Sequence, residues 1–91
     1  MTRFRTAIRD RIWTVKFVRK IRNGGIDCWG LCNVEKREIR LASGVAGQDL
    51  VETLIHELLH AHAWHIDEEF VAEASEAIAA VLYHPVVREK L

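Results

Sequence analysis

Residues 53–61, TLIHELLHA, decide how the rest of the chain is interpreted. His56 and His60 stand four residues apart, so a helix places both imidazoles on one face, one turn apart. At that spacing both rings can reach a single ion at about 2.0–2.1 Å, with Glu57 beside the ion rather than on it. This HExxH pattern predicts a site for one Zn²⁺, where Glu57 takes a proton from a metal-bound water and later hands it to the leaving amine.

The helix that carries the motif is apolar on most of its surface. From Gln48 onward its apolar positions are Leu50, Val51, Leu54, Ile55, Leu58, Leu59 and Ala61. A helix of this kind belongs in the middle of a domain, where two histidines and a glutamate are costly to bury unless a partner satisfies them. A metal ion is such a partner. We therefore prefer a metal site to a coincidental surface His-Glu-His.

A catalytic zinc needs a third protein ligand and one open position for water. A metzincin would require Gly and His at the positions of Ala63 and Ile66, so that class is excluded. His62 lies on another helix face and His65 is one residue too early, which makes both weak alternatives.

A carboxylate from the following helix is the favoured third ligand. That helix is expected over residues 68–83, after a turn at 65–67, and packs through Phe70, Ala74, Ala77, Ile78 and Val81. Glu69, Glu73 and Glu76 share one of its faces, and geometry slightly favours Glu73, nearest the apolar stripe. Glu68 is expected to point away.

The remaining sequence predicts one α+β domain over residues 1–91. Alternation of apolar and polar residues marks a half-buried strand at 11–18, and Asn23-Gly24-Gly25 breaks the chain. The expected elements are a short helix at 2–9, the strand at 11–18, a hairpin of strands at 28–34 and 38–41, and the two helices. Together they give a small antiparallel or mixed three-stranded sheet packed on the active-site helix and a C-terminal helix.

Charge is distributed unevenly, although the net charge is zero. Residues 1–40 carry 11 Lys and Arg against 4 acids, a balance of +7, and residues 41–91 carry 2 against 9, a balance of −7. A basic half can indicate nucleic acid binding, but no aromatic-rich nucleic-acid motif accompanies it. We therefore expect the two halves to complement each other within one fold, and we do not expect nucleic acid as a partner.

The chain has no apolar run near the ~18 residues of a membrane span, and its basic N-terminus lacks the core of a signal peptide. A cytoplasmic protein without membrane contact is expected, and its oligomeric state stays open. Cys28 and Cys32 would lie about 13 Å apart along one strand, too far for a disulfide. Both are expected in the core.

Two further pairs of residues could have roles around the metal. Tyr83 or His84 could donate a hydrogen bond to an oxyanion, although both more simply pack or lie on the surface at a helix end. Trp29 and Trp64 are expected in the core or in the walls of the cleft.

From Trp13 to about Leu82 the chain resembles small, often phage-encoded zinc metallopeptidases of the minimal gluzincin kind. The resemblance rests on the order of WTVKFV, WGLCN with REIRL, TLIHELLHA and DEEFV, of which only TLIHELLHA is specific by itself. It implies a zincin-like fold, with zinc held by His56, His60 and a Glu near the start of the last helix, Glu69 first and Glu73 second. It also implies that an edge strand could hold an extended peptide by strand addition.

Two functions follow from these observations. The first is a zinc-dependent peptidase acting on a peptide or protein substrate, in which Glu57 is general base and then general acid. The alternative is a metal-stabilised, non-catalytic regulatory or nucleic-acid-binding domain that uses the basic first half. The natural substrate and cleavage preference are not encoded in any motif of this chain.

Overall fold

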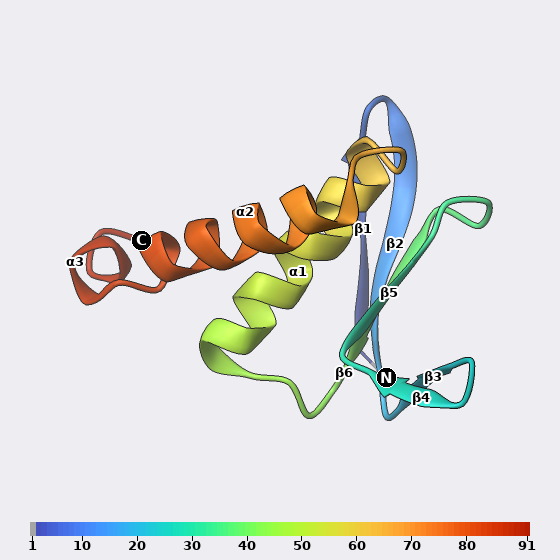
Figure 1. Ribbon diagram of the computed structural model, residues 1–91, viewed down its shortest axis with the longest axis horizontal. Helices are drawn as coiled ribbons and strands as arrows, with labels where there is room; N and C mark the ends of the chain where they lie inside the picture. The colour runs from blue at the N-terminus through green and yellow to red at the C-terminus, as the bar shows by residue number, and fades with distance from the viewer. Residues whose placement is uncertain (1) are drawn as a thin grey trace.

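The computed structural model describes residues 2–91 and places a mixed sheet on one side of the molecule and two long helices on the other (Figure 1). The main sheet has four strands in the order β1-β2-β6-β5, and a two-stranded sheet, β3-β4, adjoins it. The strands are β1 (Arg3–Ile8), β2 (Arg11–Val18), β3 (Ile21–Asn23), β4 (Ile26–Cys28), β5 (Gly30–Asn33) and β6 (Glu38–Ala42).

The sheet buries one face through alternating residues, as the period-two pattern predicts. On β2 the buried side chains are Trp13 and Val15, and on the parallel neighbour β6 they are Ile39 and Leu41. Leu50, Leu54 and Leu58 of the first long helix pack against this cluster. The prediction of a half-buried strand at 11–18 is confirmed.

The predicted hairpin is also present, since β5 pairs antiparallel with β6 from Gly30↔Leu41 to Asn33↔Glu38. The single strand predicted at 28–34 is divided, however, because β4 ends before Trp29 and pairs with β3 instead. Gly24 and Gly25, with φ of 62° and 82°, form the turn between β3 and β4. The glycine pair predicted as a break is therefore a hairpin turn that requires positive φ.

The prediction of a helix at residues 2–9 is wrong. These residues form β1, which pairs antiparallel with β2 along its whole length, so the sheet has four strands rather than three. Phe4 and Ile8 are four residues apart, a spacing that fits a helix face and equally one face of a strand. Pairing with the free edge of β2 decides in favour of the strand, through a turn at Arg9 and Asp10.

Three helices follow the sheet: α1 (Gly47–His62), α2 (Glu68–Leu82) and the single turn α3 (Pro85–Arg88). Asp67 caps α2 as predicted, because its carboxylate accepts a hydrogen bond from the backbone N–H of Phe70. In Figure 1, α1 lies between the sheet and α2, and α2 extends beyond the sheet towards α3. None of the helices within residues 2–91 is long and apolar enough to cross a membrane.

The face that α2 turns towards α1 differs from the predicted one. Val71, Ser75 and Ala79 are the buried residues of α2, and all three are fully buried. Phe70, Ile78 and Val81, predicted to pack, are 57%, 42% and 61% exposed. The small Ser75 and Ala79 let the two helices approach closely, which places the larger apolar side chains on the outside.

Candidate metal centre

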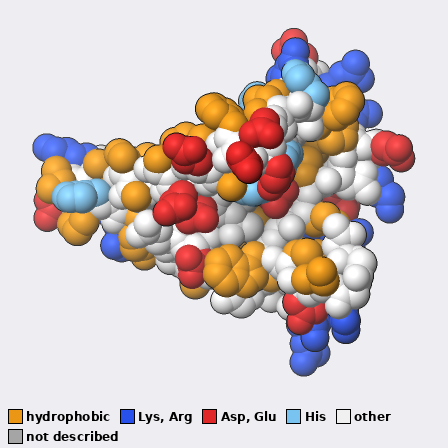
Figure 2. Space-filling model, viewed as in Figure 1, with side chains coloured by type: hydrophobic (Ala, Val, Ile, Leu, Met, Phe, Trp, Pro, Cys, Tyr) orange, Lys and Arg blue, Asp and Glu red, His pale blue; other side chains and the backbone are white. Residues whose placement is uncertain are grey.

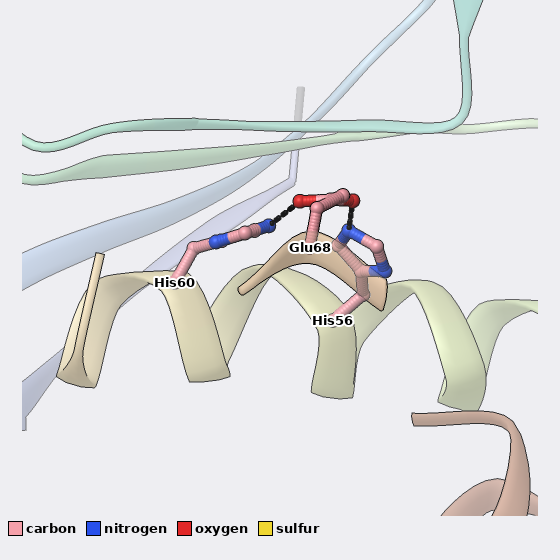
Figure 3. Close-up of side chains that lie close together, drawn as sticks. All are labelled: His56, His60 and Glu68. Carbon is pink, nitrogen blue, oxygen red and sulfur yellow. Dashed lines mark ion pairs between the residues drawn. The ribbon is translucent and has the colours of Figure 1, made fainter. Parts of the chain in front are cut away.

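His56 and His60 project from the middle of α1 towards the sheet side of the molecule (Figure 3). Their ring centroids lie 4.9 Å apart, and their side chains are 25% and 19% exposed. The i, i+4 spacing thus places both imidazoles on one face of α1, one turn apart, as the sequence predicts.

Glu68 completes the group from the first turn of α2. Its two carboxylate oxygens lie 2.8 Å from His56 Nε2 and 2.8 Å from His60 Nε2. Figure 3 shows the carboxylate between the two imidazoles. One carboxylate therefore bridges both candidate ligands of α1.

The expectation that Glu68 points away is wrong. Glu68 is itself 66% exposed, but it stands three residues before Val71, on the side of α2 that faces α1, whereas Glu69 and Glu73 do not belong to the group. The error follows from the packing stripe, because choosing Phe70 instead of Val71 rotates the helix by one residue, about 100°.

The three side chains fit a metal ion by their chemistry. Each of His56, His60 and Glu68 offers one ligand atom, and these atoms all lie within 4.8 Å of one another. Two imidazole nitrogens and one carboxylate oxygen are a donor set of catalytic zinc sites, which leave the fourth position open. Ligand atoms around a tetrahedral zinc stand about 3.3 Å apart, so small side-chain movements suffice. The residues present could hold a divalent ion.

Glu57 lies next to this group in an enclosed position. Its side chain faces β5 at Gly30, where a Cβ atom would come within 3.0 Å of Glu57 Oε2. Glu57 is only 8% exposed, and burial, together with the negative charge of Glu68, raises its pKa to about 7. A carboxyl group with this pKa exchanges protons at neutral pH, as a general base and acid must.

A cleft of about 410 Å³ opens onto the candidate metal ligands and Glu57. One wall is β5, the edge strand of the main sheet, and Trp64 stands at the other side. Trp64 and Trp29 are 67% and 57% exposed, so of the two predicted alternatives, core or cleft wall, the core position is wrong for both. Trp64 lines the cleft, and Trp29 lines a smaller hollow on the other side of Glu57.

The two cysteines are free and partly buried, and both line this cleft. Burial, and then the charge of Glu57, raises the pKa of Cys32 to about 11. Its thiol is therefore protonated at neutral pH, a poor ligand and a poor nucleophile. Cys32 also packs against the core cluster, which agrees with the predicted packing role.

Tyr83 and His84 lie away from the metal ligands. The Tyr83 hydroxyl approaches Gly47 at the start of α1, nine residues or about 13 Å before His56. His84 caps α3 by accepting a hydrogen bond from the Val86 backbone N–H. The suggestion that either could stabilise an oxyanion is wrong, and the alternative of packing at a helix end holds.

The sequence pattern of the SprT-like family matches residues 4–76. The chain belongs to the SprT-like family. The match extends from β1 into α2 and so contains Glu57 and all three candidate ligands.

Membership in the SprT-like family relates the chain to zincin-like metallopeptidases, which suggests a metalloprotease-like function. No curated protein and no solved structure matches the chain. The SprT-like pattern ends at Glu76, so the second half of α2 and α3 lie beyond it.

Proposed function

We propose that this protein is a zinc-dependent peptidase in which His56, His60 and Glu68 hold the ion and Glu57 is the general base and acid. The observation that carries the proposal is the position of Glu57: a buried carboxyl with its pKa raised to about 7 stands beside a His-His-Glu group. Structural metal sites use all four positions for protein ligands and need no such neighbour.

The mechanism assigns a separate task to each side chain. A divalent ion at this site would supply Lewis acidity, polarising the scissile carbonyl and making water a stronger acid. Glu57 removes a proton from the attacking water and then delivers that proton to the leaving amine. Burial raises the pKa of Glu57 to about 7, and a carboxyl group with a pKa near the working pH can both accept and release a proton.

The substrate we propose is an extended peptide, held by strand addition at the edge of the sheet beside the cleft. The outer edge of β5 pairs with no strand among the described residues, and it borders the cleft beside His56 and His60. A peptide added to this edge would form main-chain hydrogen bonds and pass in front of Glu57. The narrower relation to phage-encoded gluzincins remains part of this proposal, since it rests on short motifs.

Glu57→Gln tests the proposal directly. The amide keeps the shape but cannot accept the proton, so we expect zinc content to be unchanged and hydrolysis of a peptide library to fall about 10²–10⁴-fold. Glu73→Gln, on the exposed face of α2, is the matched control and keeps both zinc and activity. Full activity in Glu57→Gln, or no hydrolysis of any peptide by zinc-loaded protein, would refute the peptidase.

A further inference from the structure

A second hollow, of about 590 Å³, adjoins the metal cleft. It lies where the β1–β2 turn and the β5–β6 loop meet the C-terminal end of α1, and we name it the arginine pocket. Its charged lining consists of Arg9, Arg11, Arg37 and Glu35, and its apolar lining includes Ile8, Trp13 and Ala61. Val34 and Trp64 line both hollows, so the arginine pocket continues the cleft.

The positive charge of this pocket is not neutralised by the protein. Among residues 2–91, none of the three arginines forms an ion pair with a carboxylate, and Arg9 donates a hydrogen bond to the carbonyl oxygen of His62 at the end of α1. Glu35 is the one acid in the lining. Three arginines thus line one hollow, and guanidinium groups are suited to bind a planar anion such as a carboxylate.

Two of these arginines occupy backbone positions that disfavour them. Arg9 and Arg37 have φ of 49° and 51°, in the left-handed region that Gly and Asn adopt most easily. Arginine is disfavoured in this region, and among the described residues neither side chain gains an ion pair in return. Both residues lie in hairpin turns, Arg9 with Asp10 between β1 and β2 and Arg37 between β5 and β6, so the turns set these backbones and hold both arginines at the pocket.

The pocket lies on the path of a peptide paired with β5. That strand runs from Gly30, opposite Glu57, to Asn33, and Val34 then leads into the pocket. At about 3.3 Å per residue, two to four residues of an extended peptide separate the candidate metal centre from the arginines.

We infer that the arginine pocket binds an acidic side chain of the substrate, two to four residues from the scissile bond. The inference rests on the proposed peptidase function and names its substrate class: peptides with Asp or Glu at that distance. Whether the acidic residue precedes or follows the scissile bond would show in which direction the peptide runs along β5.

Charge across the molecule favours a single acidic side chain over a polyanion. Glu68 borders the metal cleft, with Glu69 and Glu73 exposed on the same end of α2. Figure 2 shows acidic side chains gathered over this central region, with Lys and Arg at the ends of the molecule. A nucleic acid strand running from the pocket through the cleft would meet these carboxylates, whereas one Asp or Glu reaches the arginines alone.

The test compares two peptides that differ only by Glu or Gln at the selected position, after a library has located the cleaved bond. In Arg11→Glu/Arg37→Glu we expect the ratio of kcat/KM for the acidic over the neutral peptide to fall about 10- to 100-fold. Arg3→Glu/Arg5→Glu, the same charge change on exposed β1 positions outside the pocket, leaves the ratio unchanged. Arg11→Gln/Arg37→Gln repeats the test should the reversed charges impair folding.

Binding to zinc-loaded Glu57→Gln separates this inference from the peptidase proposal. Tighter binding of the acidic peptide, lost with the two arginines, supports the pocket even if the wild-type protein cleaves nothing. Cleavage with no preference between the two peptides overturns the inference and leaves the peptidase intact. Arginine-dependent binding of DNA, without any preference for the acidic peptide, overturns it in favour of a nucleic-acid surface.

Discussion

The two long helices meet at the candidate metal centre but are held in different ways. Helix α1 lies between the sheet and α2, and its buried residues include Glu57 itself. Helix α2 contacts α1 through Val71, Ser75 and Ala79 and exposes its other side, with Val81 61% accessible. Two candidate ligands therefore stand on a helix fixed from both sides, and the third stands at the start of a helix fixed from one.

Because of this difference, two candidate ligands are held in place by the core, and the third completes the site from a less firmly held helix. The core of the sheet fixes His56 and His60, since Leu54 and Leu58 on the same helix pack against it. Glu68 depends on the short turn before α2 and on the cap at Asp67. We therefore expect His56 and His60 to contribute most of the metal affinity and Glu68 to contribute a smaller part.

The largest expected effect is on zinc affinity. We expect His60→Ala to weaken zinc binding more than about 100-fold, beyond what the loss of an outer-shell partner costs, and Glu68→Ala to weaken it about 10- to 100-fold. Competition with a chromophoric chelator at neutral pH measures both values.

The controls for this experiment lie on the neighbouring turn of α2. Glu69→Ala and Glu73→Ala, both exposed, should stay within about twofold of wild type, because the net-charge effect of a surface carboxylate is screened. A loss in Glu69→Ala with none in Glu68→Ala would mean that α2 presents a different face to α1.

The next effect concerns Glu57 in the metal-free protein. Burial and the charge of Glu68 raise its pKa from 4.5 to about 7, so the folded state resists ionisation. The contribution of Glu57 to stability is therefore fully present below pH 4.5, where it is protonated in both states, and is lost as pH rises through about 7. Between pH 5 and pH 8 we expect wild type to lose roughly 2–3 kcal/mol more than Glu57→Gln.

Denaturant unfolding of the two proteins in chelator, at both pH values, measures this difference. All other titrating groups are common to both, so their contributions cancel to first order. Equal pH dependence in the two proteins would show that Glu57 is ionised without cost, and α1 would then not be enclosed at this position.

Much of this fold could be predicted from local patterns. The strand at 11–18, the hairpin that ends with β6, and α1 all follow from hydrophobic periodicity, and Asp67 from its capping chemistry. The strand β1 could not, because Phe4 and Ile8 fit both periods and only the unpaired edge of β2 decides between them. Partner choice across the sheet is a tertiary property that a single segment does not encode.

The candidate site could likewise be predicted only in part from the sequence. His56, Glu57 and His60 lie within one turn of one helix, so their spacing alone predicts that they converge. The third ligand depends on how α2 is rotated against α1. The signal was the run of small residues Ser75 and Ala79 at i, i+4 after Val71, which permits close helix contact, but the larger Phe70 and Ile78 suggested another stripe.

Gly30→Ala tests how tightly β5 encloses Glu57. The added Cβ would lie 2.7 Å from Thr53 Cγ2 and 3.0 Å from Glu57 Oε2, so α1 and β5 must separate. We expect a loss of about 1–3 kcal/mol in the free energy of unfolding, with reduced activity. Gly44→Ala, where nothing lies within 4 Å, is the matched control and should change neither. An unchanged Gly30→Ala protein would mean that the two elements are looser than their contact indicates.

Val81→Ala has the smallest expected effect and tests the outer side of α2. Its side chain is 61% exposed, so removing two methyl groups should change the free energy of unfolding by less than about 0.5 kcal/mol, partly offset by the higher helix propensity of Ala. Val71→Ala makes the same chemical change at a fully buried position and should cost about 2 kcal/mol. Thermal and denaturant unfolding of both variants measure the contrast. Equal losses would mean that the outer face of α2 is covered in solution, and that α2 is held from both sides as α1 is.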